Sequence, residues 1–251
     1  MACRRTAPAR LAAVRTVGID FASQPKNTAI CEIDWDGSSA TVMQVVSPVT
    51  DDLIRELVVE QSARVFGVDI PFGWPIHFVD FVRAHMERGM HPTGGSATQR
   101  RLRSTDVFIW EMFRRQPLSV STDRIGIPAM RWAMLMQEFG VLNRAGDGQF
   151  YEVYPAAARI SWGLPPKDDV AALDMLMAEC PLFFAAPELR HFLLASDHAF
   201  DALICALATR AAALGLTFPP PGDVRDLAEV EGWIHAPQPG TLEQLIPADV
   251  D

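Results

Sequence analysis

The hydrophobic pattern at the start of the chain predicts three strands. Residues 15–21 are apolar and β-branched, and residues 28–35 alternate between apolar and polar positions, as a half-buried strand does. A short Asp-Gly turn at residues 36–38 favours an antiparallel connection to the next strand, at residues 41–46. The chain therefore opens with a hairpin and a neighbouring strand.

A helix and a buried strand follow. Residues 51–60 have helical periodicity, with Thr50 or Asp51 placed to cap the helix. Residues 65–70 are continuously apolar, which is typical of a strand covered on both faces. Because a helix connects them, we expect a right-handed crossover that brings residues 65–70 back parallel to the first strand.

The rest of the chain predicts mainly helices. Residues 76–148 are helical and rich in arginine, with interruptions near 91–95 and 119–126, and we expect them to form an insertion after the fourth strand. The other elements expected are a strand at 150–154, two or three helices within 156–195, a helix at 197–214 with Ser196 as its N-cap, and a short strand at 232–234.

The length of 251 residues suits a single domain, which we expect at residues 16–251 after a flexible tail at residues 1–15. The tail's apolar run is too short for a signal peptide, and no segment reaches the ~20 apolar residues of a membrane-spanning helix. The spacing of the four cysteines suits neither zinc nor a disulfide framework, and Cys31 and Cys205 lie in apolar runs typical of buried thiols. These features predict a reduced, cytoplasmic protein.

The charges are unevenly distributed. The net charge of −9 excludes a uniformly basic nucleic-acid surface. Residues 83–131, however, carry nine arginines against four acids, whereas residues 1–82 and 132–251 have net charges of −3 and −11. A basic segment beside acidic ones would suit an anionic ligand next to a carboxylate site. A solvated, arginine-rich helical surface explains the same charges.

Three aspartates lie where chemistry is expected. Asp20 ends the first strand, Asp69 ends the buried strand, and Asp201 lies near the start of the helix at 197–214. If the two strands are neighbours and the helix packs across them, the three carboxylates converge at one edge of the sheet, where they would bind Mg²⁺ or Mn²⁺. Taken singly, each has an ordinary explanation as a turn, cap or first-turn acid.

Two further residues share a helix face with Asp201. His198 is three positions before it and Asp197 is four positions before it. A neutral imidazole binds metals or moves protons, so His198 is a candidate catalytic residue, and Asp197 is a candidate additional ligand. The alternative for His198 is a cap-region residue that faces water.

Several short motifs together resemble one known family, domain of unknown function 429, whose members are described as predicted nucleases with an RNase H-like fold. The resemblance covers roughly residues 16–236. The motifs are Gly18-Ile-Asp-Phe-Ala22, Asp69-Ile-Pro-Phe-Gly73, Arg103-Ser-Thr-Asp106, Glu152-Val-Tyr-Pro155, Asp197-His-Ala-Phe-Asp-Ala202 and Glu231-Gly-Trp-Ile234.

The resemblance implies a five-stranded mixed sheet with the second strand antiparallel, flanked by helices. It also implies a divalent-metal site, Mg²⁺ or Mn²⁺, at Asp20, Asp69 and Asp201. The expected function is then metal-dependent hydrolysis of a phosphodiester in a nucleic acid or nucleotide, because two such ions clamp the attacking and leaving oxygens.

Two motifs offer further candidates for substrate binding. Arg103 would hold a phosphate, with Thr105 donating a hydrogen bond. Thr105 or Asp106 equally fits the cap of a helix that begins there. Glu152 would add or orient a ligand, or pair with a buried arginine.

Two other function classes remain open at this stage. A non-catalytic binding module for nucleic acid or nucleotide would use the same fold and keep the carboxylates for structure. A phosphotransferase of the actin-like or sugar-kinase kind also ends its first strand in Gly-Ile-Asp-Phe, but it needs a second domain and a second phosphate loop, for which the chain has neither the length nor a motif.

Overall fold

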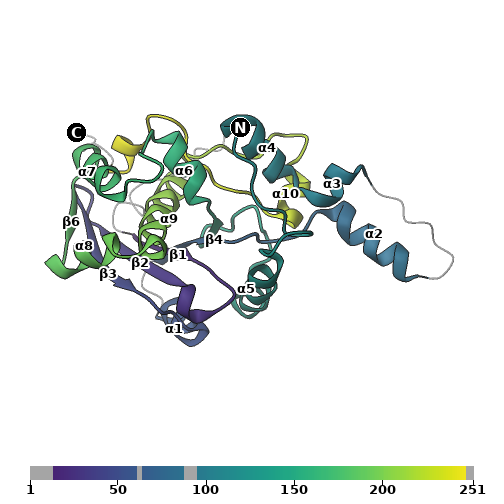
Figure 1. Cartoon of the computed structure of the whole chain (residues 1–251), viewed down its shortest axis with the longest axis horizontal. Coiled ribbons are helices and arrows are strands. Elements are labelled where there is room, and N and C mark those ends of the chain that lie inside the picture. The colour runs from purple at the N-terminus through teal and green to yellow at the C-terminus, as the bar shows by residue number, and fades with distance from the viewer. Residues whose placement is uncertain (1–13, 61–63, 88–94, 247–251) are drawn as a thin grey trace, which may run out of the picture.

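A single mixed sheet organises the protein (Figure 1). The computed structural model describes residues 14–60, 64–87 and 95–246. The fold is α/β, as expected, but the sheet has six strands rather than five, in the order β5-β4-β1-β2-β3-β6. The strands are β1 (Arg15–Asp20), β2 (Ala29–Trp35), β3 (Ala40–Val46), β4 (Arg64–Asp69), β5 (Phe150–Glu152) and β6 (Leu182–Phe184).

The centre of the sheet confirms the predicted topology. β1 pairs antiparallel with β2 and parallel with β4. In the parallel ladder Asp20 is directly opposite Asp69. Helix α1 (Asp51–Val59) makes the crossover, and the Thr50 side chain caps it by accepting a hydrogen bond from the Leu53 N–H. The two aspartates therefore end neighbouring strands at the same edge.

The far ends of the sheet differ from the prediction. β6 lies inside the segment expected to be helical and pairs parallel with β3. The strand expected at 232–234 does not form, because only an isolated bridge joins Ile234 to Glu152. Helix α10 (Arg225–Glu231) precedes that bridge and was not predicted.

Helices cover both faces of the sheet (Figure 1). In the described residues, four helices lie between β4 and β5, and of these α2 (Ile76–Met86) and α3 (Ala97–Arg101) project from the body of the molecule (Figure 1). The remaining helices are α4 (Ser104–Phe113), α5 (Gly126–Phe139), α6 (Pro155–Ser161), α7 (Asp169–Glu179), α8 (Pro187–Leu194) and α9 (Asp197–Ala213).

Two glycines allow α9 to lie directly on the sheet. Side chains two apart on a strand share a face, so Gly18 is on the face of Asp20 and Gly67 on that of Asp69. A Cβ at Gly18 would lie 2.1 Å from the Ala202 carbonyl oxygen, and one at Gly67 would lie 1.7 Å from Thr209 Oγ1. The close approach of α9 to β1 and β4 brings the start of the helix, with Asp201, towards both aspartates.

The opposite face of the sheet packs on α1 and α5. Along each strand, residues that face this second core alternate with residues that face α9. Val17 and Ile19 of β1 and Phe66 and Val68 of β4 belong to this core. Trp132 of α5 is completely buried among them. This apolar packing fixes the two strands that carry the aspartates.

The remaining sequence predictions concern cysteines, membranes and the tail. Cys31, Cys180 and Cys205 are free and buried. No single helix in the described ranges is long and apolar enough to cross a membrane; α8 and α9 pass that test only together, and a bend of 112° separates them. The predicted tail at residues 1–15 falls almost entirely outside the described residues, as does Cys3.

Candidate functional site

A cavity of about 850 Å³ opens at the edge of the sheet where β1 and β4 end. Asp20, Asp69 and His198 line it, together with the start of the loop that follows β5. Its size is within the range of about 300–1,000 Å³ that is usual for ligand pockets. The carboxylates of Asp20 and Asp69 therefore lie at the same edge of the sheet, as expected, and line one cavity.

Asp69 is the least compensated charge in the cavity. Within the described ranges, its carboxylate accepts no hydrogen bond and forms no ion pair. Burial raises the pKa of Asp69 well above its usual value, and the neighbouring carboxylates of Asp20, Asp201 and Glu152 raise it further. A proton or a cation is what this arrangement of carboxylates attracts.

Among the described residues, Asp20 has one partner, His198. The distance from His198 Nδ1 to Asp20 Oδ2 is 2.5 Å. Burial raises the pKa of Asp20, while the hydrogen bond and the charge of His198 lower it. Helix α9 starts with Ser196, whose hydroxyl caps it as predicted, so His198 lies in the first turn and half of its side chain is exposed.

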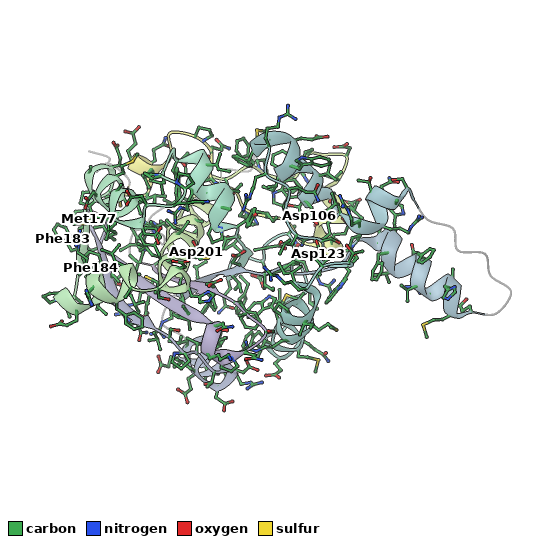
Figure 2. The ribbon with its side chains drawn as sticks, viewed as in Figure 1. Asp106, Asp123, Met177, Phe183, Phe184 and Asp201 are labelled. Atoms are coloured by element: carbon green, nitrogen blue, oxygen red, sulfur yellow. The ribbon has the colours of Figure 1, made fainter. Side chains whose placement is uncertain are left out.

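Asp201 lies one turn further along α9 (Figure 2). Burial and the charge of Asp20 raise its pKa to about 7, although Arg159 acts in the opposite direction. Asp201 and Asp197 line a neighbouring cavity of about 570 Å³ rather than the one that Asp20 lines. Because the charges of these aspartates raise one another's pKa values, we refer to Asp20, Asp69 and Asp201 together as the acid cluster.

The acid cluster is not arranged as a finished metal site. In the part of the chain that the structure describes, no three His, Cys, Asp or Glu side chains are grouped closely enough to hold an ion. The donor chemistry nevertheless fits a hard divalent cation, because carboxylate oxygens are its preferred ligands and Asp69 is uncompensated. Asp197, the candidate additional ligand, is exposed at the start of α9.

Arg103 is at the centre of a buried cluster behind the cavity. Its side chain is 1% exposed. All five N–H donors are used, by Asp106, by both oxygens of Glu152 and by the Glu231 carbonyl. This leaves no donor for a phosphate, so the geometry supports the alternative in which Glu152 pairs with a buried arginine.

The other residues of that motif also have local partners. Asp106 accepts from the Arg103 backbone N–H at the start of α4, in the manner of a helix cap (Figure 2). Thr105 Oγ1 accepts a hydrogen bond from the Ile234 N–H. Glu152 additionally accepts from the Phe72 N–H, which ties the loop after β4 to β5. These contacts shape the wall of the cavity from behind.

Sequence reasoning missed several residues that line the two cavities. Arg115 lines both, and its hydrogen bond to Tyr154 lowers the pKa of that hydroxyl, which burial otherwise raises. Arg159 lines the second cavity and pairs with Asp169 at 2.8 Å. The positive net charge of 83–131 pointed to Arg115 only as one arginine among nine.

The fold and this edge of the sheet define an α/β protein with an acid cluster at the ends of two parallel strands. The family model described as Protein of unknown function (DUF429) matches residues 18–225, and the chain belongs to that family. No curated protein and no solved structure matches the chain.

Proposed function

We propose that the protein is a divalent-metal-dependent phosphodiesterase that acts on nucleic acid. The observation that carries this proposal is the acid cluster, in which Asp20 and Asp69 are paired across two parallel strands and the pKa of Asp201 is raised to about 7. Such a cluster stores electrostatic repulsion that a cation relieves.

The sheet supports an RNase H-like fold for this enzyme. The order β3-β2-β1-β4-β5, with β2 antiparallel to its neighbours, agrees with the five-stranded sheet that the family resemblance implies, and β6 extends it at the edge of β3.

Asp20, Asp69 and Asp201 would hold Mg²⁺ or Mn²⁺, which would polarise the phosphodiester and activate water. The chain's own groups orient the site around that cation. His198 Nδ1 fixes the Asp20 carboxylate and holds a proton beside the cavity. Arg103 fixes Glu152, so that a fourth carboxylate stays neutralised next to Asp69.

The test combines metal binding with turnover. We expect calorimetry to detect Mn²⁺ binding to the parent protein, and a Mn²⁺-supported cleavage assay on single-stranded, duplex and branched DNA and RNA to detect turnover. Asp69→Asn should lower the cleavage rate by more than about a hundredfold. Even the loss of a residue that only orients a metal ligand typically lowers metal affinity or activity by about 10- to 100-fold. Asp174→Asn, an exposed acid on α7, is the matched control.

A binding module without catalysis is the second candidate. Two observations favour it: Asp20 is in contact with His198, and no group of side chains among the described residues is arranged to hold a metal ion. Nucleic-acid binding that persists with neither Mn²⁺ binding nor cleavage would support this candidate and contradict the enzyme.

A further inference from the structure

The second cavity, of about 570 Å³, extends from the acid cluster between α6 and the start of α9. Arg115 belongs to the walls of both cavities, and Asp201 is at the side of the second one. The two cavities are therefore neighbours that share Arg115 as a wall residue. Ala156, Ile160, Leu164 and Pro166 give the second cavity an apolar wall.

Three cationic and three acidic side chains line the second cavity, and only some of them are paired with each other. Arg159 is committed to Asp169 and approaches Asp201 at 3.9 Å. Arg115 and Lys167, by contrast, form no ion pair with any carboxylate in the described ranges. Two cationic side chains in one cavity, with an apolar wall beside them, are complementary to an anion that carries an apolar group.

We propose that Arg115 and Lys167 bind the phosphate next to the one at the acid cluster, so that the substrate is a strand of at least two linked nucleotides. This proposal rests on the proposed function. On this proposal, a single phosphodiester without a neighbouring nucleotide would occupy only the first cavity. A strand would also place its next phosphate and the attached nucleoside in the second cavity.

The kinetic test compares two substrates with Mn²⁺ present. Bis(para-nitrophenyl) phosphate offers one phosphodiester, and a labelled pentathymidylate offers several. Lys167→Ala should lower the ratio of kcat/KM for the strand to kcat/KM for the small diester by about tenfold, as expected for one charged contact. Lys167→Arg should restore most of that ratio. Arg190→Ala, which removes an exposed arginine from α8, is the matched control.

A binding test separates this inference from the proposed function. Fluorescence anisotropy with a hydrolysis-resistant phosphorothioate pentathymidylate gives the affinity across salt concentrations. Lys167→Ala and Arg115→Ala should each reduce the salt slope by about 0.7, the value for one lost phosphate contact on a single strand. Unaltered slopes in both variants, or no binding by the parent, would overturn the second-phosphate site. If the parent protein shows no cleavage but the two variants show the reduced salt slopes, only the proposed enzymatic function would be overturned.

Discussion

At the scale of single residues, the site depends on buried carboxylates that raise one another's pKa values. Asp201 illustrates this, because its pKa of about 7 is caused mainly by burial and by Asp20. The native protein therefore binds a proton at Asp201 more tightly than the unfolded chain does. By linkage, the contribution of this group to stability is largest below its ordinary pKa of 3.8 and is lost as the pH rises from there to about 7.

The corresponding prediction concerns the melting temperature without divalent metal. Between pH 4.5 and pH 7.5 the melting temperature of the parent should fall relative to that of Asp201→Asn, which cannot ionise. Scanning calorimetry at several pH values measures this difference. Asp174→Asn should follow the parent at every pH. A constant difference between the parent and Asp201→Asn would contradict the raised pKa.

Arg103 leads to a second prediction at this scale. Arg103→Lys keeps the charge but has three donors in place of five, so buried oxygens of Glu152 and Asp106 lose partners. Breaking a buried ion pair costs about 3–5 kcal/mol. At about 2–4 °C per kcal/mol for a chain of this size, the melting temperature should fall by roughly 10 °C. Arg144→Lys, whose hydrogen bond to the Val230 carbonyl is solvent-exposed, should change it little.

At the scale of elements, the contact of α9 with β1 and β4 brings the acid cluster together. The two strand-end aspartates follow from local sequence, because each ends an apolar strand and a helix connects the strands. Which residues line the cavities does not follow from local sequence, since Arg115, Arg159 and Lys167 meet only when three separate segments pack. A sequence pattern records what each segment buries, not which neighbour covers it.

The missed strand β6 has the same explanation. It has three residues, begins after Pro181 and forms only because β3 offers a free edge. All three residues are apolar although Phe183 is 57% exposed, so no alternation of apolar and polar residues in the sequence marks the strand. The strand expected at 232–234 was wrong for the converse reason, because an apolar segment with a strand-like composition found a single bridge partner.

Gly18→Ala tests the contact between α9 and β1. The added Cβ would lie 2.1 Å from the Ala202 carbonyl oxygen and 2.2 Å from the Ala206 nitrogen, both of them backbone atoms. Overpacking of this kind costs about 1–3 kcal/mol or more. Urea unfolding should show this loss, and Mn²⁺ affinity should fall as Asp201 moves away. Gly222→Ala has nothing within 4 Å of its Cβ and should alter neither quantity.

At the scale of the whole molecule, the proposed function predicts that divalent metal stabilises the fold. A ligand at 100 times its dissociation constant adds about 2.7 kcal/mol when it binds only the native state. Saturating Mn²⁺ should therefore raise the melting temperature by roughly 5–10 °C. The double variant Asp20→Asn/Asp69→Asn should lose most of that increase. An unchanged melting curve of the parent in Mn²⁺ would contradict the metal site.

The Arg103 cluster also has a consequence for synthesis of the chain. Its acceptor on Glu152 is 49 residues downstream, and the Glu231 carbonyl is 128 residues downstream. At about 5–20 residues per second, the ribosome needs roughly 6 to 26 seconds to deliver that last acceptor. Until then the guanidinium stays in water, because burying it without acceptors is costly. The back wall of the cavity therefore closes only after residue 231 has emerged, which makes the site one of the last parts of the nascent protein to form.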